Sequence, residues 1–155
     1  MLGKIGVTPT PAAAVQKLEL GPDALDEDVD LDAFRDRLKA RRAAVKTVLM
    51  DQTVLAGIGN ECSDEILFQA AMNPQKRINK FETDEVARLF GTMRSTLRTL
   101  VQCRLHDDEL PDIFLNKRRS TEAPCPRCGG TVVRLTVGGR KGYACTACQG
   151  IESAG

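Results

Sequence analysis

Apolar residues recur at helical spacing along much of this 155-residue chain. The clearest stretch begins at Thr83 and continues to about Cys103, with an apolar residue every three or four positions. These apolar residues are Val86, Leu89, Phe90, Met93, Leu97, Leu100 and Val101. Such spacing places apolar side chains on one face of a helix. We expect Thr83 to cap this helix, because Asp84 and Glu85 follow in the first turn, where acidic side chains interact favourably with the helix dipole.

A shorter helix is predicted after Asp30, whose carboxylate suits the N-cap position. Its apolar positions are Leu31, Phe34 and Leu38. The basic residues expected in its last turn are Lys39, Arg41 and Arg42. Cations at that end of a helix interact favourably with its carbonyl groups.

Two further helices are predicted on either side of a glycine-containing turn. The first runs from about Val45 to Val54 and is broken by Gly57-Ile58-Gly59. Asn60 is expected to cap the second, which stops before Asn73-Pro74. Glycines allow a tight turn, and the free N–H groups at the start of the next helix can bind a phosphate. Taken alone, the pattern fits an ordinary helix–helix corner equally well.

The pattern changes from helical to alternating near the C-terminus. Residues 131–137 are rich in β-branched side chains, Gly138-Gly139 is a turn signal, and residues 140–144 form the return. The sequence therefore predicts a β-hairpin in this region.

Two C-x2-C pairs flank the predicted hairpin. Cys125 and Cys128 precede it, Cys145 and Cys148 close it, and 16 residues separate the two pairs. This spacing is typical of a zinc site with four thiolate ligands. The alternative is two chance pairs of thiols, but a hairpin is well suited to bring the second pair back to the first. We predict one structural Zn²⁺, because four sulfurs leave no open position for a catalytic water.

Composition limits the class of protein. The chain has no Trp and 4% aromatic residues, which predicts a mostly aliphatic core. It has no apolar run long enough for a membrane span and no secretory signal, so we expect a cytoplasmic protein. The predicted fold is mainly α: a flexible lead over residues 1–20, a helical domain over 21–115 and a zinc ribbon over 116–155. Cys62 and Cys103 are expected to be buried reduced thiols.

Charge is unevenly distributed, although the formal total is +1. The acidic stretch consists of Asp23, Asp26, Glu27, Asp28, Asp30, Asp32 and Asp36. The basic stripe consists of Lys117, Arg118, Arg119, Arg127, Arg134, Arg140 and Lys141, with Glu122 as the one acidic residue in its span. A basic stripe is expected where a protein binds a phosphate backbone, but charge runs also form ordinary solvated faces. The acidic stretch leaves a protein-interaction module open as an alternative.

The segments LMDQTVLAGIGN and SDEILFQAAMNP together resemble the helix–two-turn–helix of the formamidopyrimidine-DNA glycosylase and endonuclease VIII family. The preceding LGPDAL resembles that family's linker. The four-cysteine hairpin, with Arg140 five positions before Cys145, resembles its zinc finger. The resemblance covers about Leu20 to Gln149 and implies a bacterial base-excision-repair protein, located in the cytosol or nucleoid.

The resemblance also implies which residues contact DNA. Asn60 would bind the phosphate next to a flipped nucleotide, with the glycine backbone at Gly59 beside it. Arg140, on the hairpin, would bind the same stretch of the DNA backbone, and Lys141, the next residue in the sequence, would lie beside it. Lys46 corresponds to a family lysine that lies toward the DNA, and we expect it to be an exposed, protonated side chain. Such contacts hold phosphates without reading base sequence.

Several positions depart from the family pattern. The family begins Met-Pro-Glu, with the Pro amine as nucleophile, whereas this chain begins Met1-Leu2-Gly3-Lys4. Glu61-Cys62 replaces an apolar–aromatic pair, Ala144 replaces an aromatic residue, and the segment 106–124 is short where relatives carry a base-covering loop. We therefore expect a monomeric protein that binds damaged or abasic duplex DNA without intrinsic glycosylase activity. The alternative is an active DNA glycosylase/AP lyase, with a catalytic lobe supplied in trans.

Overall fold

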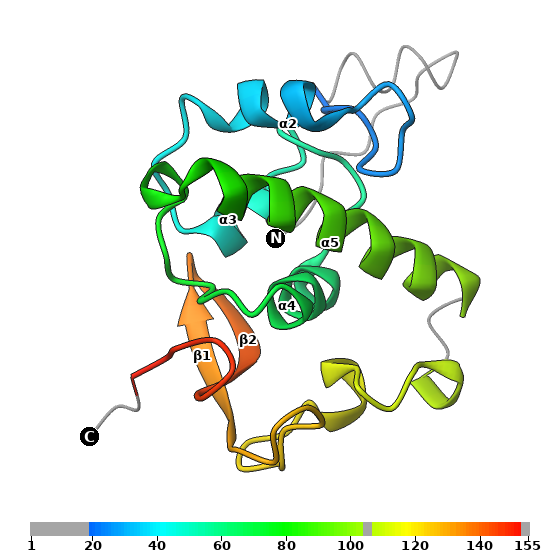
Figure 1. Cartoon of the computed structure of the whole chain (residues 1–155), viewed down its shortest axis with the longest axis vertical. Helices are drawn as coiled ribbons and strands as arrows, with labels where there is room; N and C mark the ends of the chain where they lie inside the picture. The colour runs from blue at the N-terminus through cyan, green and yellow to red at the C-terminus, as the bar shows by residue number, and fades with distance from the viewer. Residues whose placement is uncertain (1–18, 104–106, 153–155) are drawn as a thin grey trace.

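The computed structural model describes residues 19–103 and 107–152 (Figure 1). Its α-helices are α2 (Leu31–Leu38), α3 (Val45–Met50), α4 (Asn60–Gln69) and α5 (Thr83–Gln102). Short 3-10 helices are η1 (Ile78–Lys80), η2 (Asp107–Glu109) and η3 (Leu115–Arg118), and the strands are β1 (Val132–Val137) and β2 (Arg140–Cys145). This order agrees with the predicted helical part followed by a hairpin. The predicted flexible lead falls almost entirely outside the described residues.

Helix α4 is the central element of the fold. It contacts α3, α5, η3 and β2, and the hairpin lies against one side of it (Figure 1). Ile66, Leu67 and Phe68 are completely buried there. Because α4 touches both the other helices and the hairpin, it fixes the position of the hairpin relative to the turn that precedes α4.

Helix α5 buries the apolar face predicted from its spacing. Leu89, Met93, Leu97 and Leu100 are buried, as the pattern requires. Val101 was placed on the same face, but 64% of it is exposed, because each residue turns about 100° around a helix axis and Val101 follows directly after Leu100. Among the described helices, none combines the length and the apolar character needed to cross a membrane.

The predicted cap of α2 is confirmed, but its end is not. The Asp30 carboxylate accepts a hydrogen bond from the Ala33 N–H at 2.8 Å. The helix stops at Leu38, so Arg41 and Arg42 lie beyond it rather than in its last turn. Arg41 instead pairs with Asp51 at 3.1 Å.

Two other predicted caps are wrong by one residue. Thr83 is the first residue of α5, and Glu82 is its N-cap, with the Glu82 N–H donating to the Glu85 carboxylate at 2.8 Å. Asn60 is likewise the first residue of α4, after an N-cap at Gly59. In both cases the side chain expected to cap is already inside the helix.

Helix α3 ends at Met50, four residues earlier than predicted. The Asp51 carboxylate accepts hydrogen bonds from the Thr53 N–H at 2.9 Å and from the Thr53 hydroxyl at 2.6 Å. This local turn competes with helix continuation, which explains the early end.

The hairpin has the predicted form. β1 and β2 pair antiparallel, with Val137 opposite Arg140 and Val132 opposite Cys145. Gly138 and Gly139 have φ of +56° and +77°, as a two-residue hairpin turn of the primed type requires.

Candidate metal centre and nucleic-acid interface

The four predicted zinc ligands lie together at the end of the hairpin. The Sγ atoms of Cys125, Cys128, Cys145 and Cys148 are all within 4.8 Å of one another. Cys125 and Cys145 are buried, Cys148 is half-buried and Cys128 is exposed. Four sulfurs gathered in this way fit one tetrahedral Zn²⁺, so the predicted single structural zinc is confirmed.

Backbone groups around the site favour thiolate ligands. The Gly130 N–H donates to Cys128 Sγ at 3.3 Å, and this bond, together with those from the neighbouring thiols of Cys148 and Cys145, lowers the pKa of Cys128 to about 7. Burial acts in the opposite direction at Cys145 and Cys148, raising the pKa of both thiols. A bound dication offsets this cost, because it stabilises the deprotonated sulfurs.

The zinc ribbon is fixed to the C-terminal end of α4. The Arg127 guanidinium donates to the Phe68 carbonyl at 3.0 Å and to Gln69 Oε1 at 3.1 Å. It also lies over the Phe68 ring, 4.7 Å from the ring centre. Gln149 adds a second link by donating to the Met72 carbonyl at 2.9 Å. A cation at the carbonyl end of a helix is favourable, so Arg127 of the basic stripe has a structural role here.

The Gln52 side chain, for which the sequence predicted no role, stabilises the turn before α4 through two hydrogen bonds. Gln52 Nε2 donates to the Ile58 carbonyl at 3.0 Å, and Gln52 Oε1 accepts from the Gly57 N–H at 3.1 Å. Gly57 has φ of +97°, which suits glycine. The N-cap residue of α4 is Gly59, which has no side chain, so the first N–H groups of the helix receive no hydrogen-bond acceptor from the side chain of the N-cap residue.

Asn60 joins this turn to the hairpin. Its Nδ2 donates to the Lys141 carbonyl at 2.8 Å, although the two residues are 81 positions apart. Its Oδ1 is buried without a hydrogen-bond partner among the described residues. Arg140 and Lys141 are exposed, and within the described residues neither side chain has a hydrogen bond or an ion pair. The structure thus brings the backbone of Lys141, which follows Arg140 in β2, to Asn60 and the turn at Gly59.

The Lys46 side chain does not lie among these exposed residues. It is buried and forms an ion pair with Asp64, so the expectation of an exposed Lys46 is wrong, while its contact with DNA stays a prediction. Burial lowers the pKa of Lys46, and its hydrogen bond to Asp64 opposes that effect. The second oxygen of Asp64 accepts from Arg119 at 2.8 Å and from the Tyr143 N–H at 3.0 Å.

Like Arg127, two further members of the basic stripe have partners within the protein. Arg119 lies over the Tyr143 ring in addition to pairing with Asp64, and Lys117 pairs with Asp112 at 2.9 Å. The stripe is therefore not one solvated cationic face. Within the described residues, its exposed members whose side chains have neither an ion pair nor a hydrogen bond are Arg118, Arg134, Arg140 and Lys141.

A second buried acid, Glu65, was also missed. It accepts hydrogen bonds from the Leu115 N–H at 3.0 Å and the Asn116 N–H at 2.8 Å, at the start of η3. Burial raises the pKa of Glu65, and these donors oppose the rise. The local signal in the sequence is slight: Asp64 and Glu65 stand directly before the apolar run Ile66-Leu67-Phe68.

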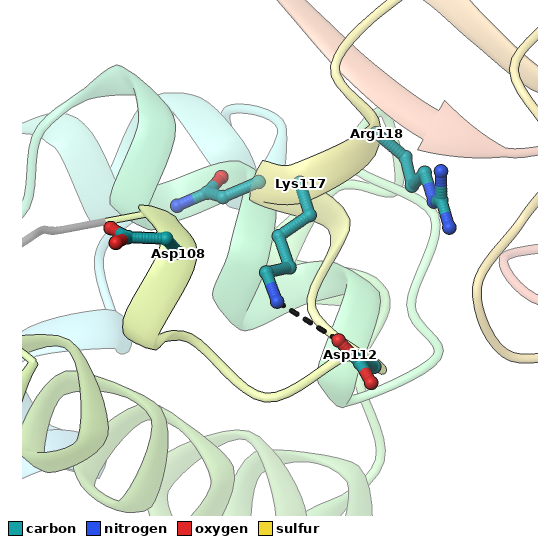
Figure 2. Close-up of a pocket in the computed structure, with 5 residues that line it drawn as sticks. Asp108, Asp112, Lys117 and Arg118 are labelled. Atoms are coloured by element: carbon teal, nitrogen blue, oxygen red, sulfur yellow. Dashed lines mark hydrogen bonds and ion pairs between the residues drawn. The ribbon is translucent and has the colours of Figure 1, made fainter.

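A shallow pocket beside η3 has mixed charge. It is lined by Asp108, Asp112, Asn116, Lys117 and Arg118. Figure 2 shows Lys117 directed at Asp112, while the Arg118 guanidinium points away from that pair. Opposite charges neutralise one another there, so the pocket lacks the net positive charge that a phosphate site requires.

Cys62 and Cys103 are half-buried rather than fully buried. Both pack against the main apolar core, and burial raises the pKa of Cys62. Their interpretation as reduced structural thiols agrees with these positions.

Comparisons with known proteins point to one family. Residues 20–106 match the formamidopyrimidine-DNA glycosylase H2TH domain, and residues 123–150 match the zinc finger found in FPG and IleRS. The formamidopyrimidine-DNA glycosylase of Thermomicrobium roseum is 36% identical over 84% of this chain and 49% of the relative. That of Pelotomaculum thermopropionicum is 32% identical over 97% of this chain and 59% of the relative.

Solved structures show the same likeness. The MutM (Fpg) protein of Thermus thermophilus superposes with a TM-score of 0.74 at 32% identity, covering 88% of this chain and 56% of that one. Fpg of Lactococcus lactis in complex with DNA containing an abasic site gives 0.77 at 26% identity, covering 89% of this chain and 54% of that one. This chain therefore spans about half the length of the relatives it matches.

A helical pair whose turn meets the tip of a four-cysteine hairpin defines a zinc-containing helix–two-turn–helix protein. The chain belongs to the formamidopyrimidine-DNA glycosylase/endonuclease VIII family of DNA-repair proteins.

Proposed function

We propose that this chain binds duplex DNA, including damaged or abasic DNA, through phosphate contacts. The observation that carries the proposal is the hydrogen bond from Asn60 to the Lys141 carbonyl. It joins the start of α4 to the backbone of β2, the strand that carries the exposed Arg140 and Lys141. Two candidate phosphate-binding features from distant parts of the chain are thereby linked.

The chemistry of this surface suits a phosphate backbone. The start of α4 offers N–H groups and the positive end of a helix dipole, both of which attract anions. Arg140 adds a guanidinium that can hold a phosphate through two parallel hydrogen bonds. None of these groups requires a particular base, so we expect binding that depends little on sequence. The relative from Lactococcus lactis has been solved with abasic-site DNA, which supports the choice of ligand.

We further propose that the chain binds DNA without glycosylase activity of its own. Lys46, the lysine that the resemblance placed nearest to DNA, is buried and paired with Asp64, so its amine is not available to attack a sugar. The zinc site has four sulfur ligands and therefore no open position for an activated water. We propose a monomer in the bacterial cytosol, where reduced thiols can hold zinc.

A salt titration tests the proposed function. Fluorescence anisotropy would follow binding to a labelled duplex with a stable abasic-site analogue and to the matching undamaged duplex. Each neutralised phosphate contributes about −0.9 to the slope of log affinity against log salt, so three or four contacts predict a slope of roughly −3. A slope near zero, or no binding at low salt, would overturn the proposal. Sedimentation of the free protein in the same buffer checks the monomer.

A further inference from the structure

A buried group of charges connects the helices to the hairpin. We call it the Asp64 cluster: the Asp64 carboxylate, the Lys46 ammonium, the Arg119 guanidinium and the backbone N–H of Tyr143. Asp64 is 1% exposed, and Lys46 is fully buried. One carboxylate oxygen contacts Lys46, while the other accepts from Arg119 at 2.8 Å and from Tyr143 at 3.0 Å. A single side chain therefore joins α3, α4, β2 and the segment after η3.

The cluster supplies the second of two links between α4 and β2. The first is the hydrogen bond from Asn60 to Lys141, and the second is that from Tyr143 to Asp64. The links are four residues apart on the helix and two residues apart on the strand. Four helical residues advance about 6 Å and two strand residues about 6.6 Å, so both links form when helix and strand run side by side. Figure 1 shows β2 next to α4.

Gly142, between the two linked strand residues, allows this close approach. A Cβ at position 142 would lie 2.5 Å from Asp64 Oδ1 and 2.6 Å from Lys46 Nζ. Both atoms belong to a buried ion pair and have little freedom to move away. Any larger residue would therefore push β2 away from α4.

We propose that the Asp64 cluster is a positioning element, which holds β2 on α4 in one register and so sets Arg140 at a fixed distance from Asn60. This inference rests on the proposed function, because it concerns how the two phosphate-binding residues are aligned. An isolated two-stranded sheet is marginally stable in water, so the orientation of the hairpin must come from contacts outside it. A buried ion pair suits this purpose, since it specifies one arrangement even where it adds little stability.

Gly142→Ala tests the proposal without removing any charge. Its control is Gly91→Ala on α5, where an added Cβ meets nothing within 4 Å. Gly142→Ala should keep one equivalent of zinc, bind the abasic duplex at least ten-fold more weakly, and exchange the Tyr143 amide proton at least ten-fold faster. Adding Arg140→Ala should then weaken binding much less than it does in the unaltered chain. Unchanged affinity or unchanged exchange in Gly142→Ala would overturn the proposal.

If Gly142→Ala does not fold, a pair of substitutions at residue 64 tests the positioning role independently. Arg119 and Tyr143 donate to the same oxygen of Asp64, so the carbonyl of Asp64→Asn can accept both bonds, whereas Asp64→Ala accepts neither. Both variants leave Lys46 without its partner, which makes them a matched pair. With equal zinc content, Asp64→Asn should bind DNA at least ten-fold more tightly than Asp64→Ala. Equal affinities would contradict a positioning role.

Different results would overturn the proposed DNA binding and the proposed positioning role of the Asp64 cluster. An unaltered chain that does not bind DNA overturns the proposed function. An unaltered chain that binds, together with a Gly142→Ala variant that binds as well, overturns the positioning role and leaves the proposed function standing.

Discussion

Arg140 is an exposed guanidinium at the point where the hairpin turn enters β2, and its direct strand partner is Val137. Because its side chain has no hydrogen bond or ion pair among the described residues, binding DNA would not require that side chain to give up an internal contact. Arg119 and Arg127 differ in this respect, since both are bound to groups of α4. Residues of the same type, close in sequence, therefore serve different purposes in this protein.

Arg140→Ala should weaken binding to the abasic duplex by about 1.5–3 kcal/mol, roughly ten-fold to a hundred-fold, because one charge-assisted contact is lost. Anisotropy titrations at one fixed salt concentration would measure the change. The matched control is Arg98→Ala, which removes an exposed arginine from α5. Equal affinities for the two variants would show that the hairpin does not touch DNA.

At the level of elements, the hairpin and the helices rest on separate apolar clusters. The main cluster is built from α2 to α5, the segments between them, and residues on either side such as Val29 and Phe114. A smaller one contains Phe68, Leu115 and Val132 together with the zinc ligands Cys125 and Cys145. The hairpin thus depends on the metal for much of its interior, whereas the helices have an interior of their own.

Removing zinc should therefore unfold the ribbon and leave the helices largely intact, since structural zinc supplies folding energy directly. Cys145→Ser, or treatment of the unaltered chain with a strong chelator, should abolish amide protection in β1 and β2 while the helical circular dichroism is mostly retained. The DNA affinity should fall as well, because the Asn60–Lys141 link is lost. A variant that keeps one equivalent of zinc and a protected hairpin would contradict this account.

At the level of the whole molecule, the features predicted correctly from sequence are those that depend on neighbouring residues. Each C-x2-C pair and the Gly138-Gly139 turn are local patterns, and the hairpin that they predict brings the two pairs together, as the structure has them. Lys46 was placed wrongly because its partner, Asp64, is 18 residues away. The contact that joins the site, Asn60 to Lys141, spans 81 residues, and no local pattern contains it.

The question that concerns the whole molecule is whether it performs chemistry on DNA. A lyase forms an imine between its amine and the aldehyde of an abasic site, with loss of water, and borohydride reduces that imine to a stable covalent adduct. Since Lys46 is buried and paired, we expect no adduct when the chain is incubated with abasic duplex and borohydride. Denaturing gel electrophoresis of the labelled strand would measure both adduct and strand cleavage. The comparison is with an Fpg relative under the same conditions, which should give both. Either adduct would contradict this expectation. If the unaltered chain gives an adduct and Lys46→Ala gives it too, the reacting amine belongs to another residue. If Lys46→Ala gives none, Lys46 is the reacting amine and its buried ion pair with Asp64 opens on DNA.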